Sequence, residues 1–267
     1  MTEARQTLET TLHGERFTVA ADRPDIAAFW QRAEAGGWET DTLDFIDRHV
    51  DANTVFVDIG AWIGPISLYA SRRAQRVLAL EPDPVAHREL VQNISVNASN
   101  VDVWHVGVDN REGSLTLYAP SGLGQSITSS FKTDKAEMIT VPTVTLDQVS
   151  LRLGLELGDA TRVVVKVDIE GHEYTLIDAI IAFAQRHRAP LHISLHPRSL
   201  YESHRKTMSA FQAKRATWRA TRALIAKLEA LGPLTLCTTG RPLSYANLLS
   251  LLIRHRRSKN FSVETGR

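Results

Sequence analysis

Between residues 54 and 197 the sequence alternates between short apolar runs rich in Val and Ile and longer segments with helical spacing. This alternation predicts parallel βαβ units, and therefore an α/β fold in which helices cover both faces of a mostly parallel sheet. Sheets of this kind bind ligands beyond the carboxyl ends of their strands. We expect strands at 54–60, 76–82, 101–108, 114–119, 138–146, 162–171, 191–197, 234–239 and 260–263, and helices at 65–74, 84–98 and 172–187.

The first fifty residues lie outside this alternation. Residues 11–22 have the pattern of a small hairpin, and residues 23–50 have that of helical segments interrupted by glycines. We therefore expect an N-terminal hairpin and helical cap at 1–50 and a main domain at 51–267.

Residues 203–232 predict one long amphipathic helix. Phe211, Trp218 and Ile225 recur at intervals of seven and define an apolar stripe. The other face is rich in Lys and Arg. Such a face is usually only solvated, but it would also suit an anionic substrate or partner.

Composition limits the class of protein. The chain has 267 residues, 43% of them hydrophobic, and a formal net charge of +1, which argues against a nucleic-acid or membrane-surface binder. Its single cysteine, Cys237, forms no internal disulfide, which fits a reducing compartment. The charged N-terminus has no signal-peptide pattern, and no segment approaches the ~20 apolar residues of a membrane helix. We expect a soluble, cytoplasmic protein.

The turn after the strand at 54–60 carries the pattern D-x-G-x-x-x-G, formed by Asp58, Gly60 and Gly64. A dinucleotide-binding turn would read G-x-G-x-x-G, and a carboxylate at the end of the strand would repel a pyrophosphate. The same carboxylate suits the cationic S-adenosylmethionine. Gly60 has no Cβ and would let the ligand approach the backbone. The structural alternative is that Asp58 only caps the following helix.

Two further acids follow neighbouring strands. Glu81 stands about twenty residues beyond the glycine turn, where an acid accepts hydrogen bonds from ribose hydroxyls. Asp109 follows the third strand and could accept from the adenine amino group. The sequence around Asp109 is also a good turn, so a structural role is equally consistent with it.

The segments "TVFVDIGAWIGPISLYAS", "VLALEPDP", "TVPTVTLDQV" and "VVVKVDIEGHEYTLI" resemble the successive motifs of the FkbM family, which are S-adenosylmethionine-dependent methyltransferases. The resemblance also includes "GWET" at 37–40 and "NFSV" at 260–263. It implies a class I, Rossmann-like methyltransferase with a mostly parallel seven-stranded sheet. Trp62 and Pro65 depart from the family pattern, in which an Asn and a small residue are more usual.

The resemblance also implies an activity and a set of binding residues. The expected reaction is methylation of a hydroxyl oxygen on a small molecule such as a sugar or polyketide, and a homodimer is compatible with it. Nucleic-acid and membrane partners are not expected. The residues implied to bind the cofactor are Glu39, Asp58, Gly60, Ala61, Gly64, Glu81, Pro82, Asp109 and Asp168.

Methyl transfer to a hydroxyl requires a positioned base, because the protonated hydroxyl is a poor nucleophile. Asp168 and Glu170 leave the strand as alternate residues and can face the same side of the cleft. His196 follows another apolar run, and imidazole titrates near neutrality, so it is the first candidate for the base. Holding a loop in place is the structural alternative. His172 is expected to point outward along its helix.

Glu173 opens the next helix, where the helix dipole favours a carboxylate, so a structural role is as consistent as a catalytic one. The histidines and acids show no metal-ligand spacing, so no metal is predicted. Two other classes of function remain open. One is a non-catalytic methyltransferase-like binding module, and the other is a nucleotide-dependent oxidoreductase, against which Asp58 and the missing third glycine argue.

The loop at 121–130 is rich in glycines and hydroxyl side chains. Such a composition suits a segment that closes over donor and acceptor. An ordinary surface loop has the same composition.

Overall fold

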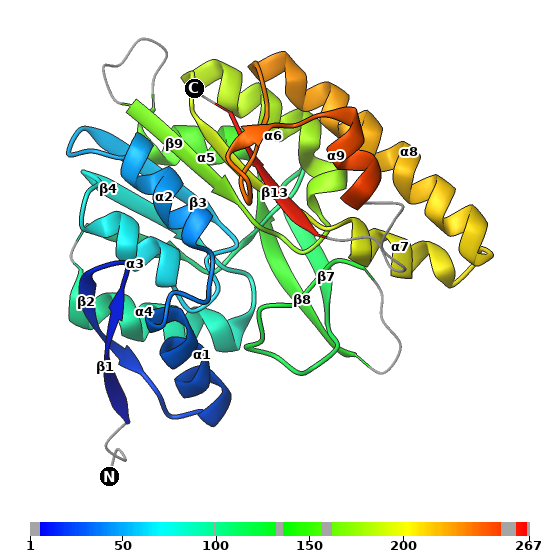
Figure 1. The fold of residues 1–267 in the computed structure, drawn as a ribbon. Helices are drawn as coiled ribbons and strands as arrows, with labels where there is room; N and C mark the ends of the chain where they lie inside the picture. The colour runs from blue at the N-terminus through cyan, green and yellow to red at the C-terminus, as the bar shows by residue number, and fades with distance from the viewer. Residues whose placement is uncertain (1–5, 99, 132–135, 156–161, 252–259, 266–267) are drawn as a thin grey trace.

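The computed structural model describes residues 6–98, 100–131, 136–155, 162–251 and 260–265. Its central feature is a sheet with strand order β12-β11-β13-β10-β9-β3-β4-β5 (Figure 1). These strands are β3 (Thr54–Ile59), β4 (Arg76–Leu80), β5 (Val101–Trp104), β9 (Arg162–Val167), β10 (Leu191–Leu195), β11 (Thr235–Leu236), β12 (Arg241–Pro242) and β13 (Phe261–Glu264).

The five strands from β10 to β5 run parallel, whereas β13, β11 and β12 are antiparallel to their neighbours. The predicted α/β fold with a mostly parallel sheet is therefore confirmed. Within the described ranges the sheet has eight strands rather than seven, because the predicted strand at 234–239 forms two-residue β11, which pairs with the equally short β12. β10 lies directly beside β9, so the residues that follow these two strands meet at one edge.

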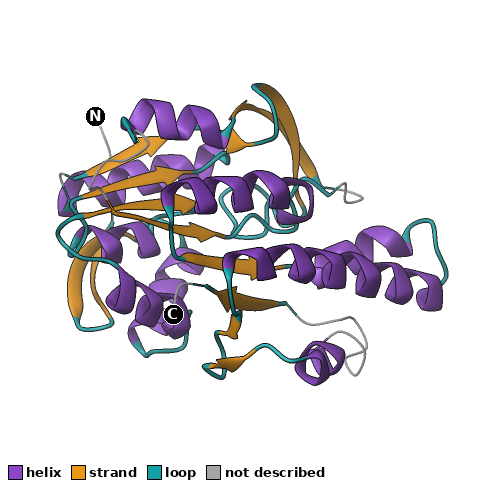
Figure 2. Ribbon diagram, turned by 90° about the horizontal axis from the view of Figure 1, so that it is seen from above, coloured by secondary structure: helices purple, strands orange, loops and turns teal. Residues whose placement is uncertain are grey.

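Helices cover both faces of the sheet (Figure 2). The side chains of β3 alternate between them: Phe56 packs with α1 to α4, and Val55 and Val57 pack with α5, α6 and α8. This alternation follows from the two-residue period of a strand. The helices are α1 (Pro24–Glu34), α2 (Thr40–His49), α3 (Pro65–Ser71), α4 (Pro84–Asn97), α5 (Leu146–Leu153), α6 (Glu173–His187), α7 (Pro197–Arg205), α8 (Ala210–Leu228), η1 (Glu229–Leu231) and α9 (Tyr245–Leu249).

The N-terminal segment contains the predicted hairpin, β1 (Thr7–Leu12) and β2 (Glu15–Ala20), followed by α1 and α2. Leu12 and Trp30 from this segment belong to the same buried cluster as Phe56 of β3. The segment therefore shares its core with one face of the sheet. The division into a cap at 1–50 and a domain at 51–267 stays a prediction.

The single helix predicted at 203–232 is wrong. α7 ends at Arg205, and α8 begins after Ser209, which caps it in a capping box with Gln212. The expected stripe is also interrupted, because Ile225 is buried but Phe211 is 78% exposed. Heptad spacing indicates which residues share a face of a helix, but it does not tell where that helix projects beyond the sheet.

A second, three-stranded sheet flanks the carboxyl ends of the parallel strands. Its order is β6-β8-β7, with β6 (Gly107–Val108), β7 (Gly113–Ala119) and β8 (Glu137–Val144). The loop predicted at 121–130 lies between β7 and β8 in the chain. None of the helices in the described part of the chain combines the length and the apolar composition that crossing a membrane requires.

Candidate active site

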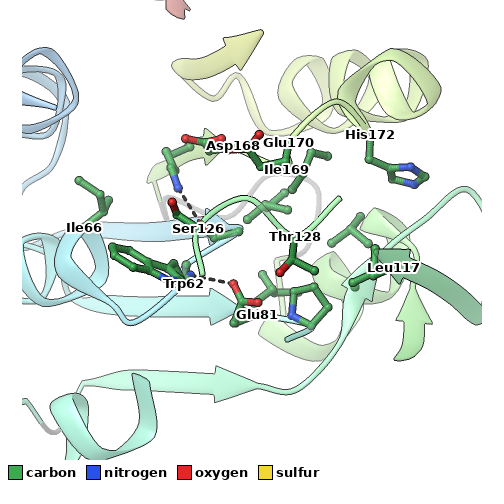
Figure 3. A pocket seen from close by; sticks show the side chains of 18 of the residues that line it. Trp62, Ile66, Glu81, Leu117, Ser126, Thr128, Asp168, Ile169, Glu170 and His172 are labelled. Carbon is green, nitrogen blue, oxygen red and sulfur yellow. Dashed lines mark hydrogen bonds between the residues drawn. The ribbon is translucent and has the colours of Figure 1, made fainter. Parts of the chain in front are cut away.

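A cavity lies at the carboxyl ends of β3, β4 and β9, and we call it the strand-end cavity (Figure 3). Seven of the residues predicted from the sequence line it: Glu39, Gly60, Ala61, Glu81, Pro82, Asp168 and Glu170. Their convergence follows from the parallel order of the strands, which brings residues distant in sequence to one edge. Four predicted residues are outside the lining that the described part of the chain forms: Asp58, Gly64, Asp109 and His196.

Gly60 is required by the close approach of two turns. Its φ is +85°, and a Cβ at this position would lie 1.8 Å from the carbonyl oxygen of Asp168. Lys166 Nζ donates to the Gly60 carbonyl at 2.8 Å. The glycine therefore joins the end of β3 to the end of β9, in addition to leaving the backbone open toward the cavity.

Asp58 lies behind the cavity wall. Its carboxylate is fully buried, accepts a hydrogen bond from Ser67 Oγ at 2.6 Å and lies 3.1 Å from Lys166 Nζ. Burial by itself lowers the pKa of Lys166, but the charges of Asp58, Asp168 and Glu39 outweigh it and raise that pKa. The negative charge of Asp58, which was expected to face a cationic ligand, is therefore paired with the positive charge of the buried Lys166.

Gly64 caps α3 with φ +94°, and a Cβ there would lie 2.5 Å from Leu90 of α4. Its place in the motif is explained by the packing of α3 against α4. Asp58 and Gly64 thus support the turn from outside the cavity lining. Gly60 and Ala61 form the part of the turn that lines the cavity.

Glu81 is held by two backbone groups. One carboxylate oxygen accepts the Trp62 N–H and the other accepts the Asp83 N–H, both at 2.7 Å. Burial raises the pKa of Glu81 to about 7, although both hydrogen bonds act to lower it. Each oxygen keeps a second lone pair that could accept from a hydroxyl of a ligand in the cavity.

Glu39 also lines the cavity and stands at the N-terminus of α2. It adopts a left-handed backbone conformation with φ 39°, and Thr42 Oγ1 donates to its carboxylate at 3.2 Å. Burial, and next the charge of Asp168, raise the pKa of Glu39 to about 8. Trp62 and Glu170 also line the cavity with positive φ. Such conformations in residues other than glycine concentrate at functional sites.

Asp109 meets the cavity only through a partner. Its Oδ1 lies 3.3 Å from Nε2 of His172, which does line the cavity and is 7% exposed. Nδ1 of His172 is 3.0 Å from Ser130 Oγ. The expectation that His172 points outward is therefore wrong, because the turn before α6 directs its ring back over the strand ends.

His196 is surrounded by three carboxylates. Its Nε2 is 3.4 Å from Asp168 Oδ1 and 3.6 Å from Glu170 Oε1, and its Nδ1 is 3.2 Å from Glu173 Oε1. Burial by itself lowers the pKa of His196, but Glu173, Asp168 and Glu170 outweigh it and raise the pKa to about 10. The expectation that His196 titrates near neutrality is wrong, since it is already protonated at pH 7 and cannot take up another proton.

Glu170 has the acid–base properties that were expected of His196. Burial raises its pKa to about 7; the charge of His196 opposes this shift, and that of Asp168 adds to it. Glu170 also lines a second hollow, here called the outer hollow, whose other lining includes Ile127, Phe131, Arg198 and Lys206. It is therefore placed where the two spaces adjoin.

The loop at 121–130 lies over the strand-end cavity and is anchored to it. Gly124 donates its N–H to Asp83 Oδ2 at 2.8 Å, and its carbonyl accepts from Trp62 Nε1 at 3.0 Å. Ser129 Oγ donates to the Glu170 carbonyl at 2.6 Å. Residues from this loop, Gln125, Ser126 and Thr128, complete the lining.

Several lining residues were missed by the sequence analysis as parts of the site: Trp38, Trp62, Lys166, His172, Gln125, Ser126 and Thr128. Lys166 and His172 lie beside Asp168 and Glu170 in the sequence, and their position in that motif was an available signal. The loop residues belong to the segment 121–130, whose composition suited a closing segment, but an ordinary surface loop has the same composition, so the sequence did not identify which of its residues line the cavity.

The cavity fits S-adenosylmethionine better than a dinucleotide. Its polar wall contains the Asp168 carboxylate beside the turn at Gly60, which suits a cationic ligand and would oppose a pyrophosphate there. The turn at Gly60 leaves backbone exposed beside it. This arrangement argues against the oxidoreductase alternative.

Comparison with known proteins finds methyltransferases among the proteins similar to this chain. A curated relative, the hexuronic acid methyltransferase AglP of Haloferax volcanii, is 26% identical over 170 residues, which cover 63% of this chain and 65% of the relative. The methyltransferase sdnD of Sordaria araneosa is 36% identical over 83 residues, covering 29% of this chain and 32% of the relative. The chain thus spans less than two thirds of either relative.

Among solved structures, the methyltransferase FkbM from Methylobacillus flagellatus has a TM-score of 0.40 and 18% identity, covering 80% of this chain and 44% of the other. The family model of the methyltransferase FkbM domain matches residues 58–229, more than half of the chain. This match includes the turn at Gly60, Glu81 and the block from Lys166 to Glu173. The chain therefore belongs to the FkbM family of methyltransferases, which use S-adenosylmethionine as methyl donor.

Proposed function

We propose that the protein transfers the methyl group of S-adenosylmethionine to a hydroxyl oxygen of a small carbohydrate-like molecule. The observation that carries this proposal is the position of Glu170, which lines both the strand-end cavity and the outer hollow. With the cofactor in the first space and the acceptor in the second, the two reactants would meet at a carboxyl group with a pKa of about 7.

The cofactor supplies an electrophilic methyl group. Glu39, Glu81 and Asp168 would hold it, because all three acids line the cavity. Glu170 would accept the proton of the acceptor hydroxyl as the oxygen forms its bond to the methyl carbon. His196, which stays protonated, would keep Asp168 and Glu170 in position through its Nε2. Positioning the acceptor oxygen in line with the methyl group would supply most of the remaining rate enhancement.

The outer hollow suits an acidic sugar. Arg198 and Lys206 supply two cations, and Ser199 and Ser203 add hydroxyl groups that can bond to a polyol. Arg198 is paired with Glu202 at 3.3 Å, but both side chains are about half exposed, so a ligand carboxylate can compete for the guanidinium. The relative from Haloferax volcanii is a hexuronic acid methyltransferase, which supports the same class of acceptor.

The test is methyl transfer from isotopically labelled S-adenosylmethionine to glucuronic and galacturonic acid, with glucose and galactose as neutral counterparts. We expect label in the uronic acids and an O-methyl group by NMR. Glu170→Gln should slow transfer by about 10²–10⁴-fold and retain cofactor binding by calorimetry, and Arg198→Ala should raise KM for the uronic acids only. Cofactor binding without transfer to any hydroxylated acceptor would instead support a non-catalytic binding module.

A further inference from the structure

A group of three side chains outside the strand-end cavity has the composition of a zinc site. Asp41 in the first turn of α2, His192 on β10 and Cys237 just after β11 each offer one ligand atom, and these atoms lie within 4.8 Å of one another. The described lining of the strand-end cavity includes none of the three. The group is therefore separate from the proposed catalytic residues.

His192 is the most informative member of the group. Its side chain is fully buried, and its Nε2 lies 3.4 Å from Thr42 Oγ1. Thr42 Oγ1 donates its single proton to Glu39 Oε2 at 3.2 Å when Glu39 is ionised, and in that state its oxygen accepts from Nε2 of His192. In the neutral ring the other nitrogen, Nδ1, is then a bare acceptor.

Nδ1 of His192 is buried and has no hydrogen-bond partner among the described residues. A buried acceptor without a partner is costly, and native structures rarely retain one without a reason. A charged ring would be worse, because it would bury an unpaired N–H. A metal ion is a partner that requires this state: a neutral imidazole with one free lone pair and its other nitrogen donating to a neighbouring oxygen.

We propose that Asp41, His192 and Cys237 bind a divalent zinc ion. A thiolate, an imidazole and a carboxylate are its three usual protein ligands, and the thiolate and imidazole disfavour magnesium and calcium. Tetrahedral zinc places such ligand atoms about 3.4–3.6 Å apart. Because the ligand atoms lie within 4.8 Å of one another, the group would contract by at most about 1.4 Å on binding. Asp41 and Cys237 are partly exposed, which gives the ion a path of entry and leaves a fourth position for water.

The ion would join three segments that are distant in sequence. It would fasten the first turn of α2 to β10 and to the end of β11, the second strand from one edge of the sheet. Thr42 in the same turn also bonds to Glu39, which lines the strand-end cavity. The role is therefore structural, with a secondary effect on how firmly Glu39 is held.

The experiment uses the full-length protein, stripped with a chelator and then titrated with Zn²⁺ and with Co²⁺. We expect about one equivalent of each to bind, a rise in Tm with Zn²⁺, and a thiolate-to-cobalt charge-transfer band in the Co²⁺ form. Cys237→Ala should remove that band and weaken Zn²⁺ binding at least tenfold. Thr238→Ala, an exposed neighbour in the same turn, should behave as the wild type.

Two outcomes would overturn the proposal. One is a wild type that takes up no more Zn²⁺ than Cys237→Ala. The other is Co²⁺ binding without a thiolate band, and in that case loss of binding in Glu170→Gln would assign the ion to the group around His196. If Cys237→Ala proves unstable without metal, Asp41→Asn replaces it, with Zn²⁺ affinity as the readout.

Discussion

Nδ1 of His196 lies 3.2 Å from Oε1 of Glu173, and the same oxygen accepts the backbone N–H of His196 at 2.7 Å. The second oxygen of Glu173 accepts the Gly171 N–H at 2.8 Å. One fully buried carboxylate thus ties the turn between β9 and α6 to the end of β10. It also positions the imidazolium ring of His196, whose Nε2 faces the carboxyl groups of Asp168 and Glu170.

Glu170→Gln should lower kcat by about 10²–10⁴-fold and leave S-adenosylmethionine affinity within a few-fold of wild type, because a positioned base contributes about that much. With the pKa of Glu170 near 7, wild-type kcat should rise with pH through neutrality as the carboxylate forms. The positive charge of the bound cofactor would stabilise the Glu170 carboxylate and so lower the pH at which kcat reaches half its maximum. A wild-type profile that is flat from pH 5 to 8 would contradict the assignment.

His196→Gln should destabilise the fold by about 3 kcal/mol, because three clustered carboxylates lose their buried cation. The folded-state pKa of about 10 is above the usual 6.5, so this stabilisation is full below pH 6.5 and is lost as the pH rises through 10. Urea unfolding at pH 6 and pH 10 checks this. The difference in the free energy of unfolding between wild type and His196→Gln should be smaller at pH 10 than at pH 6. His105→Gln, which changes an exposed ring, should unfold with nearly the wild-type free energy at either pH.

Glu81→Ala should weaken S-adenosylmethionine binding about tenfold to a hundredfold, because hydrogen bonds to a charged group are worth about 1.5–3 kcal/mol. Calorimetry measures this loss directly. Glu112→Ala, on an exposed turn, is the control and should bind as the wild type does. If Glu81→Ala bound S-adenosylmethionine as tightly as the wild type, the role of Glu81 would be limited to supporting the turn at Trp62.

Gly60→Ala and Gly36→Ala form a matched pair. Both glycines have positive φ, +85° and +74°, so both substitutions meet similar backbone strain. Only at Gly60 does the new Cβ meet other atoms, 1.8 Å from the Asp168 carbonyl oxygen. We expect Gly60→Ala to lower the free energy of unfolding by at least about 2 kcal/mol more than Gly36→Ala. Equal values in denaturant melts would show that the contact between the two turns is easily relieved.

Trp62→Phe removes the indole N–H that donates to the Gly124 carbonyl and keeps a ring beside Phe29, at 4.5 Å in the wild type. Losing one such bond costs about 0.5–1.5 kcal/mol, so hydrogen exchange in residues 121–130 should accelerate up to about tenfold. Trp38→Phe, which leaves this bond in place, is the control. Identical exchange in all three proteins would show that the loop is held by other contacts.

The sequence by itself predicted most of the fold and the edge of the sheet where the site lies. The alternation of strands and helices is a local property, and the parallel order then brings Gly60, Glu81 and Asp168 together without further information. Local patterns also predicted the hairpin at β1 and β2. They failed at 203–232, because a short break with its own cap looks like continuous helix when only apolar spacing is followed.

The tertiary structure decided what each charged residue is able to do. Asp58 is neutralised by Lys166, and His196 is held charged by Glu173, because burial and neighbouring charges set the protonation state, and both come from other segments of the chain. Asp41, His192 and Cys237 likewise show no spacing pattern in the sequence. They meet only because α2, β10 and the turn after β11 are folded against one another, and such proximity is a property of the packed chain rather than of any local stretch of it.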